Sequence, residues 1–167
     1  MRCITKEKQG VGMSDYEPTV LIVEDVKAQQ LLIQELITRV LPNALFILAD
    51  TLTEALERVE DCNLVILDLG LPDTKVGCTE SIQRLRGKTL VPIIVCSATF
   101  SLDLVRECIR SGANGYANKD EQLISLTAQI VQLEIQNKEM KDKRKRVKQV
   151  FQETQQGLSR ILGVSPT

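Results

Sequence analysis

The sequence predicts a doubly wound α/β domain, in which helices cover both faces of a five-stranded parallel sheet, followed by one long C-terminal helix. Short apolar segments alternate along the chain with longer segments of helical periodicity. The apolar segments do not alternate between polar and apolar residues, as expected for strands buried on both faces. A seven-residue apolar repeat then runs through the final part of the chain.

The predicted strands are short runs rich in Val, Ile and Leu. They are Val20–Val23, Leu45–Leu48, Leu64–Leu67, Pro92–Cys96 and a weaker Gly115–Ala117. Because a helical segment follows each strand, right-handed crossovers would place all five in one parallel sheet. In such sheets ligands bind outside the carboxyl ends of the strands.

The predicted helices show apolar residues at spacings of three and four. Thr51 or Thr53 can cap the second helix and Ser101 the fourth, while Pro42 and Gly112 mark the ends of the first and the fourth. The predicted ranges are Ala28–Leu41, Leu52–Val59, Thr79–Leu85 and Leu102–Ser111.

Composition narrows the classes of function. Residues 1–120 hold 13 basic and 17 acidic side chains, whereas residues 121–167 hold 8 and 5, so the body carries no basic field and nucleic acid is not expected as the main partner. The chain has no histidine, which excludes imidazole metal ligands and a phosphohistidine. Its five cysteines lack a Cys-x-x-Cys pair and are expected to be reduced thiols.

The domain plan follows from the same patterns. Residues 1–17 are polar and glycine-rich and are expected to form a mobile extension, followed by the α/β domain at 18–122, the extended helix at 123–162 and a tail at 163–167. No apolar run approaches the roughly 18 residues of a membrane span, and the first residues lack an apolar secretion core. A cytoplasmic protein is therefore expected.

Three acidic residues end two of the predicted strands: Glu24 and Asp25 follow the first, and Asp68 follows the third. Neighbouring parallel strands lie about 4.8 Å apart, so these carboxylates can share a small cation. Mg²⁺ fits, because it prefers oxygen ligands and keeps several waters. Ser97 and Lys119 come after the last two strands, at the same edge. Together these groups suit phosphoryl transfer to a carboxylate nucleophile.

Four segments in order resemble the signatures of the two-component response-regulator receiver family, over about residues 18–135. This resemblance implies a flavodoxin-like sheet of order 2-1-3-4-5. The segments are Val20-Leu21-Ile22-Val23-Glu24-Asp25, Val65-Ile66-Leu67-Asp68-Leu69-Gly70-Leu71-Pro72-Asp73, Cys96-Ser97-Ala98 and Gly115-Tyr116-Ala117-Asn118-Lys119.

The resemblance also implies roles for single residues. Asp68 would accept phosphate from a sensor histidine kinase or a phosphotransfer protein. Asp25, Asp68 and the backbone carbonyl of Gly70 would bind Mg²⁺, with Glu24 acting through water. Lys119 would bind the phosphate, and Ser97 would hydrogen-bond to it once it is attached. Tyr116 would then turn inward and change the surface formed by the fourth helix, the last strand and the fifth helix.

Two positions depart from the family pattern. Asp120 stands where a proline often follows the lysine, so the cis peptide of such a proline is not expected. The loop after Asp68 has one extra residue before Gly77. Taken alone, Lys119 would read as a surface lysine and Tyr116 as a packing residue without a switching role.

The C-terminal repeat predicts a continuous helix over Glu121–Leu162, about 60 Å long, whose stripe pairs with a second copy as a parallel homodimer through residues 123–162. Asn137 at an a position favours two parallel strands. Lys138–Lys148 holds seven basic and two acidic residues and reads as a solvated face of the coil. The stripe is Leu123, Leu126, Ile130, Leu133, Asn137, Met140, Arg144, Val147, Phe151, Thr154, Leu158 and Ile161.

The expected function is therefore a signalling phosphoacceptor, which catalyses its own phosphotransfer and dephosphorylation but is a regulator and not an enzyme. It would signal through the Tyr116 face and the coiled coil. The alternative is a scaffold or dimerisation module with a receiver-like fold that works without phosphate. A haloacid-type phosphatase fits poorly, because no Asp-x-Asp signature surrounds Asp68.

Overall fold

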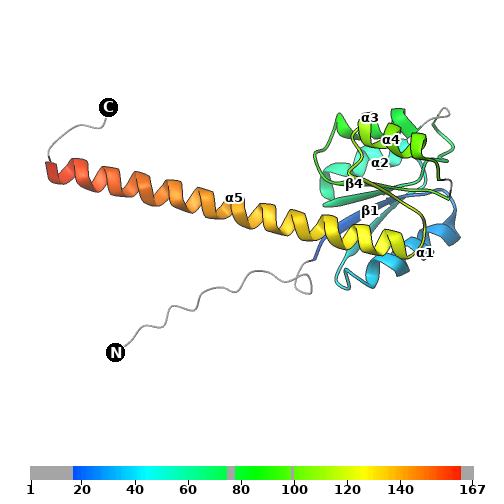
Figure 1. Ribbon diagram of the computed structural model, residues 1–167, viewed down its shortest axis with the longest axis horizontal. Helices are drawn as coiled ribbons and strands as arrows, with labels where there is room; N and C mark the ends of the chain where they lie inside the picture. Colours follow the sequence, from blue (N-terminus) through cyan, green and yellow to red (C-terminus); the bar gives the residue numbers. More distant parts are fainter. Residues whose placement is uncertain (1–16, 75–77, 99, 163–167) are drawn as a thin grey trace. The chain divides into compact units, whose positions relative to one another are not determined.

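The computed structural model describes residues 17–74, 78–98 and 100–162 (Figure 1). The described residues up to Val131 form one compact unit, and the helix from Gln132 onward belongs to a second. The extension before residue 17, the loop positions 75–77, Thr99 and the tail from 163 lie outside the described residues. Predictions that fall on them, including the longer loop before Gly77, are therefore left as predictions.

The elements alternate as the sequence predicts, and all five strands are parallel in the order β2-β1-β3-β4-β5. The strands are β1 Thr19–Val23, β2 Leu45–Ala49, β3 Leu64–Leu67, β4 Ile93–Cys96 and β5 Gly115–Ala117. The helices are α1 Lys27–Thr38, α2 Leu52–Arg58 with the 3-10 turn η2 Val59–Asp61, α3 Cys78–Arg86, α4 Leu102–Arg110 and α5 Glu121–Leu162. The predicted fold class is confirmed.

The sheet is covered on both faces, with α2, α3 and α4 together on one side and α1 on the other (Figure 1). Alternate residues of the central strands enter opposite cores, so every residue of β3 and β4 is buried. Leu21, Val23 and Val65 belong to the cluster that packs under α2, α3 and α4. This double burial explains why the strands read as unbroken apolar runs.

Side-chain caps mark where α2 and α4 begin. Thr51 Oγ1 accepts the Glu54 N–H at 3.1 Å, and Ser101 Oγ accepts the Leu104 N–H at 3.1 Å, so both predicted caps form. α1 stops at Thr38, before the predicted end at Leu41. Leu41 precedes a proline, which disfavours helical backbone at that residue, and it is instead buried in the core.

The turn after α4 depends on Gly112, whose φ of +109° favours glycine. Its carbonyl accepts a hydrogen bond from Arg86 Nε at 2.7 Å, and Arg86 Nη1 also donates to the Val91 carbonyl at 2.6 Å. Burial lowers the pKa of Arg86. This arginine therefore ties the end of α3 to the turns that precede β4 and β5. All described peptide bonds are trans, including the one before Asp120, as expected.

The buried cysteines behave as small apolar side chains. Cys62, Cys96 and Cys108 are buried thiols. Burial raises the pKa of Cys62 to about 11 and that of Cys96 to about 12, so both stay protonated and unreactive near neutral pH. The expectation of reduced thiols is confirmed for these three residues.

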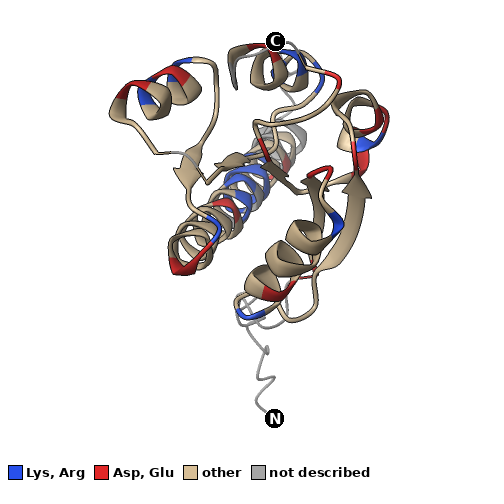
Figure 2. Cartoon of the chain, turned by 90° about the vertical axis from the view of Figure 1, so that its right-hand side faces the viewer, with Lys and Arg blue, Asp and Glu red and all other residues tan. Residues whose placement is uncertain are grey.

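The helix α5 spans 42 residues, as the repeat predicts. Its first stripe residues pack into the core of the sheet domain: Leu123 is fully buried, and Leu126 occupies the space that a side chain at Gly115 would fill. From Leu133 onward the described stripe residues are exposed, and basic residues gather along the helix (Figure 2). No described helix is both long and apolar enough to cross a membrane.

Candidate functional site

Strand register brings two of the predicted acidic residues together. Val23 of β1 lies beside Leu67 of β3, so Glu24 and Asp68 are neighbours one step beyond the strand ends. The Asp68 N–H donates to the Val23 carbonyl at 2.9 Å. The sheet therefore fixes the backbone of both residues at its carboxyl edge.

Lys119 joins the two carboxylates from the loop after β5. Its Nζ lies 2.5 Å from Glu24 Oε2 and 2.9 Å from Asp68 Oδ1. A third hydrogen bond goes to the side-chain oxygen of Gln29, in the first turn of α1. All three N–H donors of the ammonium group therefore have acceptors. The side chains of this cluster are well shielded, with exposed fractions of 11% for Lys119, 1% for Glu24 and 12% for Asp68.

The charges of the cluster support one another. Burial opposes the charge on Lys119, but hydrogen bonds from it to Glu24 and Asp68, with the charges of both carboxylates, outweigh this cost and raise the pKa of Lys119. Lys119 is therefore positively charged at neutral pH. With Asp25, which follows Glu24 and is exposed, the site holds three carboxylates against one ammonium group.

The Asp68 carboxylate has one hydrogen-bond or ion-pair contact on each oxygen. Its Oδ2 accepts the Gly70 N–H at 2.7 Å, and its Oδ1 accepts from Lys119. Since a carboxylate offers about four lone-pair positions, acceptor sites remain on both oxygens. A side chain at position 70 would put its Cβ 3.1 Å from Asp68 Oδ2. Glycine at this position therefore leaves room beside the carboxylate.

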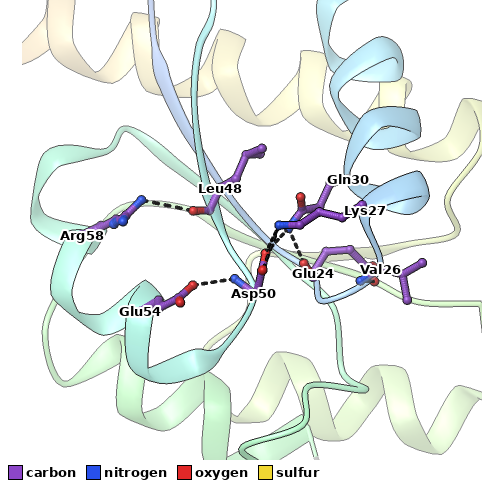
Figure 3. Close-up of polar contacts among 8 residues, drawn as sticks. All are labelled: Glu24, Val26, Lys27, Gln30, Leu48, Asp50, Glu54 and Arg58. Carbon is purple, nitrogen blue, oxygen red and sulfur yellow. Dashed lines mark hydrogen bonds and ion pairs between the residues drawn. The ribbon is translucent and has the colours of Figure 1, made fainter.

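A polar network holds the loop that carries Glu24 and Asp25 (Figure 3). The buried Gln30 donates to the Glu24 carbonyl at 2.5 Å and to Asp50 Oδ1 at 2.8 Å. Lys27 pairs with the same Asp50 carboxylate at 2.6 Å. The hydrogen bond from Lys27, together with that from Gln30, lowers the pKa of Asp50. The end of β2 thus fixes the start of α1 and the acidic loop before it.

Ser97 directly follows β4, the neighbour of β3, and Tyr116 lies in β5, the edge strand beyond β4. Ser97 is buried directly after β4, and its N–H donates to the Ala117 carbonyl at 3.2 Å. Tyr116 is half-buried in β5 and packs edge-to-face on Phe100, with ring centroids 6.2 Å apart at 71°. Phe100 itself is 60% exposed. This aromatic pair links β5 to the segment just before α4.

The donor set fits a small, hard cation. Glu24, Asp25, Asp68 and the carbonyl of Gly70 offer only oxygen atoms, and their net charge with Lys119 is negative. Among the described residues no three acidic or thiol side chains already converge as a metal cage. Mg²⁺ is commonly held by one or two carboxylates with water and phosphate oxygens, so a complete cage is not required.

Sequence reasoning missed three polar residues of this site: Gln29, Gln30 and Asp50. Gln29 and Gln30 follow the acidic pair in the first turn of a helix, where a polar residue is equally expected on a solvent face. Asp50 directly follows strand β2, which pairs with β1. This position at the same edge of the sheet is the one sequence signal that could have indicated its place in the site. Of the predicted residues, Lys119 directly contacts both Glu24 and Asp68.

Comparison with known proteins places this geometry in a family. The family model for the response regulator receiver domain matches residues 20–131. The transcriptional regulatory protein KdpE of Staphylococcus aureus is 33% identical over 113 residues, covering 66% of this chain and 47% of KdpE. The chain thus spans about half the length of this curated relative.

Solved structures share the fold. The receiver domain of a putative LuxO repressor from Vibrio parahaemolyticus has a TM-score of 0.61 at 24% identity, over 76% of this chain and 96% of that one. A CheY-like receiver protein from Methanospirillum hungatei has a TM-score of 0.61 at 21% identity, over 75% and 99%. The Mn²⁺-bound response regulator Rcp1 has a TM-score of 0.53 at 22% identity, over 68% and 88%.

The family match covers more than half of the chain, and the fold and the acidic edge of the sheet agree with it. Receiver domains of this kind act as phosphoacceptors in two-component signalling and are not generally classed as enzymes. The chain belongs to the response regulator receiver domain family.

Proposed function

We propose that Asp68 accepts a phosphoryl group from a sensor histidine kinase or a phosphotransfer protein in a Mg²⁺-dependent reaction. The observation that carries this proposal is the ion pair of Lys119 with Asp68, 2.9 Å long, at the carboxyl edge of the sheet beside Glu24. A carboxylate oxygen of Asp68 would form the new bond to phosphorus as the bond from phosphorus to the donor's imidazole nitrogen breaks, and that nitrogen keeps the electron pair.

The other residues of the site would stabilise the charge of the transferred group. Lys119 donates to the phosphoryl oxygens, exchanging part of its present hydrogen bonding for them. Asp25, Asp68 and the Gly70 carbonyl hold Mg²⁺, and Glu24 acts on it through water. The ion neutralises charge on the phosphoryl group. Rcp1, a protein of the same fold, is described as Mn²⁺-bound, which agrees with a divalent ion in sites of this family.

The phosphorylated state would be read through Ser97 and Tyr116. Ser97 hydrogen-bonds to the phosphoryl group, and Tyr116 moves inward, away from its edge-to-face contact with Phe100. Because Phe100 is mostly exposed, this movement would change the surface beside α4. The homodimer predicted for residues 123–162 would be limited to the exposed part of the stripe, which starts at Leu133, because Leu123 is buried in the receiver core.

Beryllofluoride binding tests the acceptor role directly, because beryllofluoride mimics the acyl phosphate. Calorimetry with Mg²⁺ should show binding to the wild type and none to Asp68→Asn. Acetyl phosphate should label the wild type, and the label should disappear with time through self-catalysed hydrolysis. Asp103→Asn is the matched control, since Asp103 is an exposed carboxylate on α4 that pairs only with Arg106 among the described side chains.

Two outcomes would contradict the proposal. Labelling of Asp68→Asn equal to that of the wild type would put the acceptor elsewhere. A folded wild type that binds neither Mg²⁺ nor beryllofluoride would instead support the scaffold, in which the receiver fold works without phosphate.

A further inference from the structure

The exposed part of α5 carries an apolar stripe that calls for a partner helix. Leu133, Met140, Val147 and Phe151 are 58%, 51%, 69% and 61% exposed. Their spacing of seven, seven and four residues places all four on one side of the helix, at d, d, d and a positions. Such a stripe is buried when two helices pair, so the partner is another helix.

Charged residues beside the stripe restrict which helix that can be. Lys141 and Lys148 occupy e positions and Lys143 a g position, and Arg144 stands within the stripe at an a position. All four are exposed. The two acidic residues of the same stretch fall at c and f positions of the heptad repeat in the sequence.

A second copy of the same helix fits this segment poorly. In a parallel two-stranded coil, a g residue faces the e residue of the next heptad on the partner helix. Lys143 of each copy would therefore face Lys148 of the other, and the two Arg144 side chains would meet in the seam. Like charges at these positions repel each other, so they disfavour pairing with a second copy relative to pairing with an acidic helix. Carboxylates on the partner would turn both contacts into attractions.

We propose that residues 140–151 of α5 are a docking surface for an acidic amphipathic helix of another protein, with carboxylates opposite Lys143 and Lys148. This inference rests on the coiled-coil role of α5 proposed above, but not on the homodimer. The apolar stripe supplies the contact area, and the basic flanks select the partner by charge. The homodimer would then be weaker than the complex with the acidic helix. Salt should strengthen the homodimer, because it screens the repulsion between the basic residues.

A charge-reversed copy of the chain serves as the acidic partner in the test. Wild-type protein labelled at its N-terminal amine is titrated with the full-length seam variant Lys143→Glu/Lys148→Glu, and binding is followed by sedimentation with fluorescence detection. At low salt the wild type should bind this variant on the order of tenfold more tightly than it binds itself. The preference should shrink at about 1 M salt, where the Debye length falls to about 3 Å.

The matched control changes the same charge away from the seam. Lys138→Glu/Lys145→Glu alters two exposed b positions, so it should bind the wild type no more than about twofold more tightly than the wild type binds itself. Lys143→Gln/Lys148→Gln removes the repulsion without adding attraction and should give an intermediate affinity. Circular dichroism should show equal helix content, since Glu and Gln favour helices about as well as Lys.

Equal affinity for the wild type and the seam variant would overturn the inference, as would an equal gain from the control variant. Pairing with the seam variant but no self-association at any salt would remove the proposed homodimer and uphold the docking surface. A polyanion such as duplex DNA senses total charge, so equal weakening of DNA binding by both variants, without heterotypic pairing, would overturn the inference in favour of nucleic acid. A failure of the protein to bind beryllofluoride would contradict the proposed role of Asp68 and would leave the docking surface on α5 unaffected.

Discussion

Replacing Asp73 with alanine should destabilise the receiver unit, because Asp73 caps a helix that is distant in sequence. Its Oδ1 accepts the Leu52 N–H at 2.9 Å, and its Oδ2 accepts the Thr53 N–H at 2.9 Å and the Thr53 hydroxyl at 2.8 Å. Asp73 thereby ties the loop after Asp68 to the first turn of α2. Leu71, in the same loop, is buried and anchors it from the other side.

The magnitude follows from the contacts that are lost. Losing a capping side chain costs about 1 kcal/mol, and a negative charge at a helix N-terminus contributes about 0.3–1 kcal/mol. Asp73 is exposed, so the charge contribution is taken at its low end. The expected loss in the free energy of unfolding is about 1.5 kcal/mol. Asp73→Asn should lose less, because asparagine also caps well. Thr51 still caps Glu54, so α2 should persist.

The effect should depend on pH. Burial alone would raise the pKa of Asp73, but the hydrogen bonds from Leu52 and Thr53 outweigh it and lower this pKa below its ordinary value. A carboxyl group with a lowered folded pKa adds stability above its unfolded pKa of about 3.9, and this stability is lost as pH falls through the folded value. The difference between wild type and Asp73→Asn should therefore be full at neutral pH and shrink below about pH 4.

Urea unfolding followed by tyrosine fluorescence measures this difference. With a slope near 1.5 kcal/mol per molar, Asp73→Ala should lower the midpoint by about 1 M. Asp103→Ala is the control, because Asp103 lies in the first turn of α4 but, among the described side chains, makes only a surface pair with Arg106. An Asp73→Ala midpoint equal to that of the control, or a difference from Asp73→Asn that persists below the folded pKa, would refute the reasoning.

Two further variants test the site and the fold. Gln29→Leu removes one acceptor of Lys119 and frees an N–H for a phosphoryl group, so calorimetry should show that beryllofluoride binds about fivefold more tightly. The control Gln34→Leu, on the same helix, should leave this affinity unchanged. Weaker beryllofluoride binding by Gln29→Leu would contradict the idea. Gly112→Ala forces a side chain onto a φ of +109° and should lower the free energy of unfolding, measured in urea, by about 2 kcal/mol. Gly87→Ala should be nearly neutral, because its Cβ would lie 3.4 Å from the Arg84 carbonyl oxygen, an ordinary contact. Equal losses for the two variants would contradict this account.

The strands and the acidic edge of the sheet could be predicted because short segments of the sequence determine each of them. Leu64–Leu67 is an unbroken apolar run that ends in Asp68, and β1 ends in the same way at Glu24 and Asp25. Parallel topology then puts both ends at one edge without further information. The fold class and the neighbouring positions of Glu24 and Asp68 therefore follow from short segments alone.

Long-range polar contacts could not be predicted in this way. Asp73 caps a helix 21 residues earlier, and Gln29 accepts from Lys119 across 90 residues of sequence. Neither residue type nor periodicity distinguishes these side chains from solvated ones. The heptad pattern has the same ambiguity, since Leu123 is fully buried against the receiver while Leu133 is 58% exposed. A repeat shows that one face is apolar, but not what covers each part of it.

Asp120 shows how a departure from the family pattern can be a working part of the fold. It stands where a proline is common, and its Oδ1 accepts the Gln122 N–H at 2.8 Å at the start of α5. The Leu123 N–H donates to its carbonyl at 3.0 Å, and Leu123 is anchored in the core. Lys119 is thus joined to a capped and buried helix end by a single peptide bond. Any shift of Lys119 towards a phosphoryl group on Asp68 must therefore be absorbed within Asn118–Asp120 or passed to the first turn of α5.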